Sequence, residues 1–218
     1  GKRIAIPRQF FNNIDPEIEI KFNQIKELFI SKGYTVDVVD LNVLEYCLSC
    51  YYILVPAEVS SNMARFDGLR YGSNSTLDQF TAYDLSSWYK EYRSQFGNEV
   101  KRRIGLGNYI LSSGYFDAYY RQAAKLRHFL IDSVDDLFSN YDYVLGPTTP
   151  TVAPEIGIAE DNPINLYLSD IMTVLANLVG SPAISLPLLE ISGMPLGVQL
   201  MSKRASDFDL LELVGDLL

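Results

Sequence analysis

Hydrophobic and polar positions change their period twice within the first 41 residues. The segment Lys2 to Pro7, which is apolar from Ile4 onward, predicts a short buried strand. Asp15 followed by Pro16 is typical of a helix start, and Gly33 predicts the end of that helix. Apolar residues recur between them at helical spacing: Ile18, Phe22, Ile25 and Phe29. The β-branched, alternating run Tyr34 to Leu41 predicts a second strand, so this region should form a parallel βαβ unit.

The segment from Val43 to Phe66 gives a mixed pattern. Its stretch "YYILVPAE" favours a strand by propensity, but Pro56 would interrupt a strand. The overlapping stretch "AEVSSNMARF" favours a helix. The pattern does not decide between the two.

The rest of the chain alternates between helical and strand patterns. A helix capped by Asn98 should run to about Ser113. Further elements are predicted as a helix over 116–138, a strand and loop over 141–150, a helix over 166–179, and strands over 182–188 and 195–203. The helix over 116–138 should bury one face: Tyr120, Ala124, Leu130, Val134 and Leu137. We therefore expect an α/β fold with a mostly buried sheet.

Composition and charge narrow the classes of protein. The chain has 218 residues, 48% of them hydrophobic, and a formal net charge of −9. This balance is opposite to that of dedicated nucleic-acid binders, and the basic run Lys101 to Arg103 has no basic neighbours. No apolar run reaches the ~20 residues that a membrane span needs. Because the chain begins directly with a strand pattern, we expect it to be a piece of a longer protein or one half of a divided one.

Common catalytic and metal-binding patterns are nearly missing from the sequence. Cys47 and Cys50 form one C-x-x-C pair, and with a single histidine, His128, they do not complete a zinc site. A redox pair is conceivable from the spacing, but reduced thiols fit better because no thioredoxin-like pattern surrounds them. His128 lies in an amphipathic helical pattern, which favours an ordinary structural or surface histidine over a catalytic base. The "GLG" of residues 105–107 lies inside a helical pattern, so it is not a phosphate-binding loop.

Two single charged residues in apolar or helical surroundings say more about a binding site than these patterns do. Asp170 stands among apolar residues, where a carboxylate needs a partner or a hydrogen-bond network. Arg103 is the kind of partner that holds carboxylates by two-point hydrogen bonds. One interpretation is a structural Arg–Asp pair or a solvent-facing aspartate. The other is that both charges face one pocket and bind the two ends of a zwitterion.

Several motifs carry a resemblance to a known family. They are "YYILVPAEVSSNMARFDGLRYG", "EVKRRIGLGNYILSSGYFDAYYRQAAKLR", "DYVLGPTTPTVAPEIG", "NLYLSDIMTVLANLVGSPAISLPL" and "GMPLGVQLMSK". Together they resemble the C-terminal half of the glutaminase subunits of tRNA-dependent amidotransferases, within the amidase signature family. The resemblance runs from about Gly1 to Leu218. It implies that 1–218 is the C-terminal half of a single domain, with a mixed β-sheet covered by helices on both faces.

The same resemblance implies a glutamine site. Arg103 resembles the arginine that binds the α-carboxylate of glutamine in the family, and Asp170 resembles the aspartate that binds its α-ammonium group. Tyr51 resembles a tyrosine that lines the same pocket. The family's Ser–cisSer–Lys triad belongs to the N-terminal half, which precedes residue 1. We therefore expect no catalytic residue, no metal and no cofactor in this chain, and no activity of the chain alone.

The resemblance also implies partners. Ammonia freed from glutamine would pass to the B-subunit of the complex, which uses ATP and magnesium to convert Glu-tRNA(Gln) to Gln-tRNA(Gln) and contacts most of the tRNA. A small accessory subunit, together with the missing N-terminal half, completes the expected assembly. Departures from bacterial patterns, such as "LPLLEISGMP", suggest the mitochondrial matrix, with the bacterial cytoplasm as the alternative. Two alternative functions stay open: another amidase signature hydrolase acting on a neutral amide, and a non-catalytic assembly module.

Overall fold

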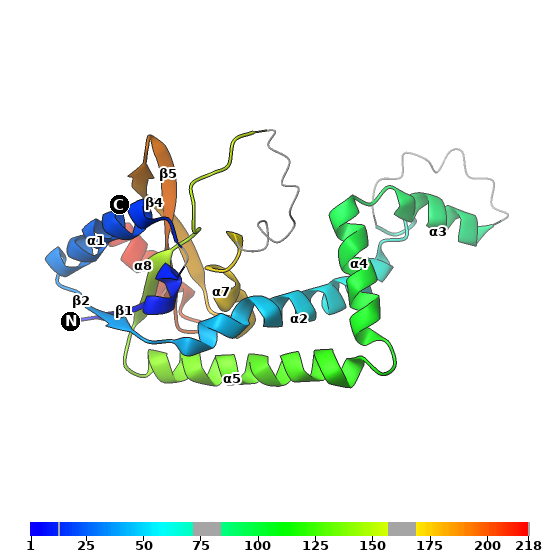
Figure 1. Cartoon of the computed structure of the whole chain (residues 1–218), viewed down its shortest axis with the longest axis horizontal. Helices are drawn as coiled ribbons and strands as arrows, with labels where there is room; N and C mark the ends of the chain where they lie inside the picture. The colour runs from blue at the N-terminus through cyan, green and yellow to red at the C-terminus, as the bar shows by residue number, and fades with distance from the viewer. Residues whose placement is uncertain (13, 72–83, 157–168, 218) are drawn as a thin grey trace. The chain divides into compact units, whose positions relative to one another are not determined.

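A computed structural model describes residues 1–12, 14–71, 84–156 and 169–217, and within them a five-stranded mixed sheet is the central element (Figure 1). The strand order is β2-β1-β3-β5-β4. The strands are β1 (Arg3–Pro7), β2 (Thr35–Val39), β3 (Tyr143–Pro147), β4 (Ala183–Ile191) and β5 (Met194–Ser202). β1 pairs in parallel with β2 and β3, whereas β5 pairs antiparallel with β3 and β4. The predicted α/β class is confirmed.

The N-terminal βαβ unit forms as its sequence predicts. Helix α1 (Pro16–Ser31) starts where the side chain of Asp15 accepts a hydrogen bond from the backbone N–H of Glu17. It ends before Gly33, whose φ of 90° lies in the left-handed region that other residues avoid. The chain then enters β2 beside β1, with Arg3 opposite Thr35.

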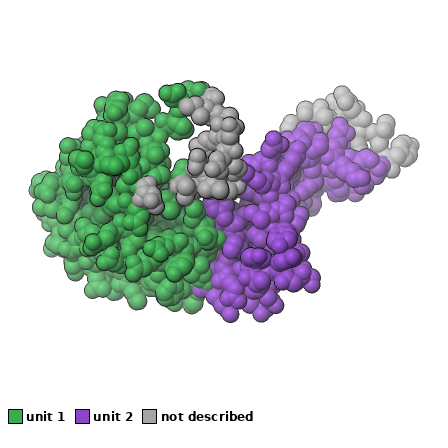
Figure 2. Space-filling model, viewed as in Figure 1, with its two compact units in different colours: residues 1–51, 126–218 green, residues 52–125 purple. Residues whose placement is uncertain are grey.

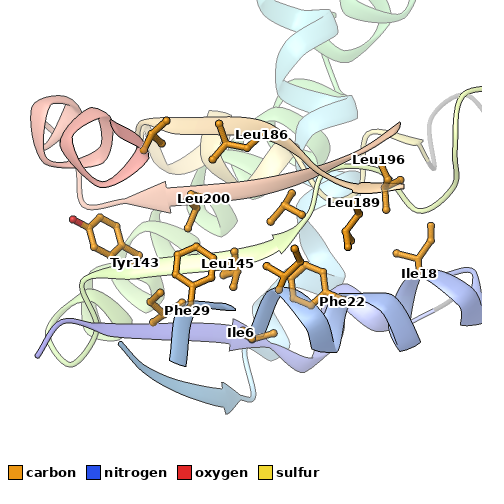
Figure 3. Packing of buried hydrophobic residues seen from close by; sticks show 14 of the residues in the cluster. Ile6, Ile18, Phe22, Phe29, Tyr143, Leu145, Leu186, Leu189, Leu196 and Leu200 are labelled. Atoms are coloured by element: carbon orange, nitrogen blue, oxygen red, sulfur yellow. The ribbon is translucent and has the colours of Figure 1, made fainter. Parts of the chain in front are cut away.

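One face of the sheet packs on α1 and on α8 (Asp207–Leu217). Alternate residues of β1, β3 and β5 point to this face because side chains alternate along a strand. Figure 3 shows them meeting the apolar stripe of α1. The cluster includes Ile4, Ile6, Ile18, Phe22, Ile25, Phe29, Tyr143, Leu145, Leu196, Val198 and Leu200. This burial is the main source of stability of the fold.

The opposite face is covered as well. Helix α7 (Val174–Val179) lies on the other side of the sheet from α1 and α8 (Figure 1), and five of its six residues are buried. Helix α5 (Arg121–Phe138) contributes the buried Leu130 and Val134. The prediction of helices on both faces is therefore confirmed.

β4 and β5 form a hairpin. Ser192 and Gly193 at its turn both have positive φ, 51° and 81°, as a type I′ turn requires. The register of the two strands shifts between Leu186 and Leu189, around Pro187. Proline cannot donate to a ladder, so an irregularity in an edge strand accommodates it.

The chain divides into two compact units, coloured in Figure 2. Unit 1 consists of residues 1–51 and 126–218 and contains the sheet. Unit 2 consists of residues 52–125, and the secondary structure described in it (52–71 and 84–125) is helical. The remaining helices are α2 (Cys47–Asn62), α3 (Leu85–Ser94) and α4 (Asn98–Leu111). Short helical turns are η1 (Arg8–Phe11), η2 (Asn42–Tyr46), η3 (Met63–Arg65) and the π-helical η5 (Phe116–Tyr120).

The structure decides one open case and corrects other predictions of local structure. The stretch "YYILVPAE", for which the sequence left strand and helix open, is part of α2, which continues through Pro56. Asn98 is the first residue of α4 and Gly97 occupies the cap position. Ala124 is exposed, and the neighbouring Ala123 is buried instead. The predicted helix over 166–179 is regular from Val174; residues 166–168 lie outside the described part of the chain.

Close packing against α4 accounts for the position of Pro56. An added Cβ on Gly107 of α4 would lie 2.0 Å from the carbonyl oxygen of Pro56 and 2.7 Å from Cβ of Ser60. Pro56, Ser60 and Gly107 are all buried. The tertiary contact between the two helices thus outweighs the local preference of proline against a helix interior.

We expect Gly107→Ala to lower the free energy of unfolding by about 1–3 kcal/mol, because an overpacked contact forces the backbones apart. Gly105→Ala is the matched control on the same helix, where an added Cβ meets nothing within 4 Å. It should raise the free energy of unfolding by about 0.5–1 kcal/mol through helix propensity. Urea denaturation followed by circular dichroism measures both variants. Equal effects of the two substitutions would contradict the close contact.

Candidate functional site

In unit 1, the carboxyl ends of β1 and β3 form the edge of the sheet best suited to a site. The chain leaves β1 for β2 on one side and later returns to the other side of β1 as β3. Connections therefore diverge at the ends of these two parallel strands, which is where open α/β sheets commonly bind ligands. The segments that follow are η1 after β1 and the Thr148–Pro150 loop after β3.

Two glycines at this edge leave room for the side chains of neighbouring segments. An added Cβ on Gly197 of β5 would lie 2.3 Å from Oγ of Ser185 and 2.7 Å from Oγ1 of Thr148. These two hydroxyls are 2.7 Å apart and share a hydrogen bond. An added Cβ on Gly146 of β3 would lie 2.5 Å from the ring of Phe10. The motifs "LGPTTP" and "GMPLGVQL" thus place small and hydroxyl-bearing residues side by side.

A pocket of about 320 Å³ opens beside this edge. It is lined by Gln9, Phe10, Asn12, Leu44, Glu45, Ile171 and Met172. Gln9 is fixed on both sides, because its Nε2 donates to Oδ1 of Asn42 at 2.8 Å and its Oε1 accepts from the N–H of Leu41 at 2.9 Å. The pocket therefore has one wall made of rigid polar groups from the β1 end and another made of the residues directly after Asp170.

Asp170 lies in the turn that leads into α7, and it is half-buried. Its carbonyl oxygen accepts hydrogen bonds from the N–H groups of Thr173 and Val174 at 3.0 and 3.1 Å. The hydroxyl of Thr173 donates to the same oxygen at 3.1 Å. The backbone at Asp170 is thus closely held. Tyr51, in α2, is also half-buried and belongs to the same unit.

Arg103 lies on α4 in unit 2, with its side chain 26% exposed. Its Nε donates to Oε1 of Glu99, one turn earlier, at 2.7 Å. The guanidinium carbon lies 5.9 Å from the ring centroid of Tyr52, a cation–π distance. Since Arg103 belongs to unit 2, whereas Tyr51 and Asp170 belong to unit 1, a common pocket for all three stays a prediction.

The sequence reasoning missed Glu99, which orients the arginines of this helix. Glu99 also pairs with Arg102. Burial disfavours ionisation of Glu99, but the hydrogen bonds from Arg103 and Arg102 outweigh it and hold the pKa of the carboxyl below its usual value. The spacing of Glu99 and Arg103, four residues apart on a predicted helix, was the signal that could have found this pair.

Asp67 is a second residue that the sequence reasoning missed. It is 5% exposed and stands in the "RFDGLRYG" part of a family motif. Its carboxylate accepts hydrogen bonds from the backbone N–H groups of Arg70 and Leu69, and it pairs with the Arg70 guanidinium. Its carbonyl oxygen accepts from the indole N–H of the buried Trp88 at 2.9 Å. This part of the motif is explained by folding of unit 2.

The cysteines and the histidine behave as expected from their patterns. Cys47 and Cys50 are reduced and fully buried. Burial raises the pKa of the Cys47 thiol to about 12 and that of Cys50 to about 11, so neither is a reactive thiolate at neutral pH. The side chain of His128 is 78% exposed on α5. Within the described ranges, no three His, Cys, Asp or Glu residues gather as a metal site would require.

The comparison with protein families identifies the fold. A family model described as Amidase matches residues 1–211. The chain belongs to the amidase family. In keeping with this, the amidase-family chain superposes on the "Crystal structure of amidase" with a TM-score of 0.74 over 97% of its length and 44% of that chain. At 21% identity, that likeness concerns the fold alone.

More similar relatives share one name, that of the A-subunit of glutamyl-tRNA(Gln) amidotransferase. The protein of Clostridium botulinum (strain Alaska E43) is 41% identical over 216 residues, which cover 98% of this chain and 44% of the relative. That of Agathobacter rectalis is 43% identical over 204 residues, 92% of this chain and 40% of the relative. The Thermotoga maritima crystal structure is 32% identical, with a TM-score of 0.69 over 95% of this chain and 40% of that chain.

The motif-based resemblance is thereby confirmed. The amidase-family chain spans about two fifths of the length of these curated relatives and corresponds to their C-terminal portion. The three relatives are bacterial, so they do not support the mitochondrial location expected above. None of the helices in the described segments is long and apolar enough to cross a membrane.

The Asp67 interactions predict a pH dependence. Backbone N–H groups of Arg70 and Leu69 lower the pKa of Asp67 from 3.8 to about 2 in the folded chain. Ionised Asp67 therefore stabilises the fold above its unfolded pKa of about 4, and this contribution is lost as the pH falls through about 2. Between these values, the stability of the wild type should fall more steeply than that of Asp67→Asn. Denaturant unfolding between about pH 2 and pH 4 measures the free energy of unfolding of both proteins. The same slope against pH in both would contradict this role of Asp67.

The buried thiols predict slow chemical labelling. In the native protein at pH 8, neither Cys47 nor Cys50 should react with a thiol reagent on the timescale at which an unfolded control reacts at both. The reason is that both thiols are inaccessible and almost fully protonated. Counting labelled sites by mass spectrometry before and after denaturation measures this. Rapid native labelling of either cysteine would revive the redox interpretation of the pair.

Proposed function

We propose that this chain is the glutamine-binding part of the glutaminase subunit of a tRNA-dependent amidotransferase. In that enzyme, ammonia released from glutamine converts Glu-tRNA(Gln) to Gln-tRNA(Gln). The observation that carries the proposal is the 41% identity to the A-subunit of a glutamyl-tRNA(Gln) amidotransferase over 98% of the chain. An amidase domain without this specific similarity would support only amide hydrolysis in general.

The chemistry of the assigned residues suits an amino acid ligand. A guanidinium carries five N–H donors, so Arg103 can keep its bond to Glu99 and still present donors to a carboxylate. The Glu99 carboxylate and the Tyr52 ring restrict the orientation of that guanidinium. We assign Arg103 to the glutamine α-carboxylate, Asp170 to its α-ammonium group, and Tyr51 to the wall of the pocket.

Hydrolysis itself is assigned to residues outside this chain. The Ser–cisSer–Lys triad of the family would come from the remaining part of the same subunit, so this chain alone would not release ammonia. The B-subunit would use ATP and magnesium and contact most of the tRNA, and a small accessory subunit would complete the complex. The relatives named above favour the bacterial cytoplasm over the mitochondrial matrix as the compartment.

Two alternatives make different predictions. A hydrolase of neutral amides would leave the charges of Arg103 and Asp170 without matching groups on the substrate, which is costly in a desolvated site. Turnover of simple amides well above that of glutamine would favour it. An assembly module would bind a partner subunit without binding glutamine.

We expect Arg103→Ala and Asp170→Ala each to raise the KM for glutamine by about 10- to 150-fold in the assembled amidotransferase, because each removes a charge-assisted hydrogen bond worth about 1.5–3 kcal/mol. Arg102→Ala is the matched control, since Arg102 neighbours Arg103 and pairs with the same Glu99. Its KM should stay within about twofold of the wild type. Steady-state glutaminase kinetics measures all three. Wild-type KM and kcat in both site variants would refute the assignment.

A further inference from the structure

Gln199 is an amide buried in the middle of β5. It is 7% exposed, and its side chain points to the same face of the sheet as Gly197 and Met201, opposite to the α1 and α8 core. Its Nε2 donates to the carbonyl oxygen of Met172 at 2.9 Å. A buried amide on a sheet face is costly unless it is paired, so this hydrogen bond accounts for a glutamine in the middle of a buried strand.

The acceptor belongs to the turn that bears Asp170. Met172 is 2% exposed and, with Ile171, lines the pocket at the carboxyl edge of β1. Within the turn, Thr173 and Val174 donate to the carbonyl oxygen of Asp170. Those bonds fix the shape of the turn, but they all lie within it. The Gln199 bond is different, because it ties the turn to the sheet.

The hydrogen bond from Gln199 to the turn determines where the side chains of that turn lie relative to the sheet. The turn is not paired to β5 as a strand would be, so its distance from β5 depends on side-chain contacts. The Gln199 bond lies two residues from Asp170 along the chain, close enough that a shift of Met172 moves the Asp170 side chain. Productive binding geometry tolerates displacements of roughly 0.5 Å.

We infer that Gln199 is a positioning residue that holds Asp170 at the place where it meets the ammonium group of the amino acid substrate. This inference rests on the proposed function, because it gives Asp170 the role assigned there. Gln199 does not touch the substrate; it acts through the Met172 carbonyl and the turn.

The test uses Gln199→Met in the assembled amidotransferase, since methionine keeps the length of the side chain and removes the donor. The KM for glutamine should rise about 5- to 10-fold, as expected for one buried hydrogen bond, with kcat within about twofold. Ser202→Ala is the control. Ser202 is also buried on β5 and its hydroxyl bonds with Ser206, at the end of the strand away from the pocket. That variant should lose stability without a change in KM.

A double-mutant cycle separates positioning from a general structural effect. If Gln199 acts through Asp170, Gln199→Met should add little to the KM of Asp170→Asn, whereas independent effects would multiply. Gln199→Glu supplies a second variant of the same shape. Its carboxyl can donate only when protonated, so its KM penalty should grow with pH relative to the wild type.

The outcomes distinguish the two proposals. An unchanged KM in Gln199→Met together with a raised KM in Asp170→Asn would overturn the positioning role and leave the proposed function in place. An unchanged KM in Asp170→Asn would refute the assigned glutamine site itself. Equal rises in Gln199→Met and Ser202→Ala, or fully multiplicative effects in the cycle, would also overturn the positioning role.

Discussion

The parallel pairing of β1 with strands on both of its sides is the constraint on which the rest of unit 1 depends. Parallel strands need crossover connections, and α1 supplies the first while the helices from α2 to α5 supply the second. The two connections diverge at the carboxyl ends of β1 and β3. Polar and small residues of β3, β4 and β5 gather there, and the turn bearing Asp170 lies against the same edge.

Hydrogen bonds to or from backbone groups hold the irregular segments around Asp67 and Asp170. The Asp67 carboxylate accepts from two backbone N–H groups, and the Asp170 carbonyl accepts from two more. Gln199 binds a carbonyl rather than another side chain. Such bonds fix irregular segments that cannot be held by a helix or a strand ladder. The parts of the family motifs around Asp67 and Asp170 are thus explained by hydrogen bonds that hold turns in place.

Sequence patterns predicted the elements whose stability is local or strongly periodic. The apolar stripe of α1, its Asp15 start and its Gly33 end lie where the sequence indicates. Around Pro56 the local pattern left helix and strand open, because the helix is stabilised by a contact with Gly107, 51 positions along the chain, which no local pattern reveals. Asp170 was expected within a helix, but it precedes one, because its carbonyl is engaged in a turn. Arg103 was singled out by its charge and given its role by the resemblance, whereas its orientation by Glu99 needed the structure.

The contact of Gly107 with Pro56 couples positions that are distant in sequence. Glu99, Arg103 and Gly107 follow one another at intervals of four on α4, and Tyr52, Pro56 and Ser60 do the same on α2. Arg103 faces Tyr52 as Gly107 faces Pro56 and Ser60. The contact at Gly107 therefore sets the distance between α2 and α4, and that distance determines how close the Arg103 guanidinium lies to Tyr52, one helical turn away. A redesign at Arg103 would have to treat both stripes as a single unit, since a larger residue at 107 would also displace the guanidinium.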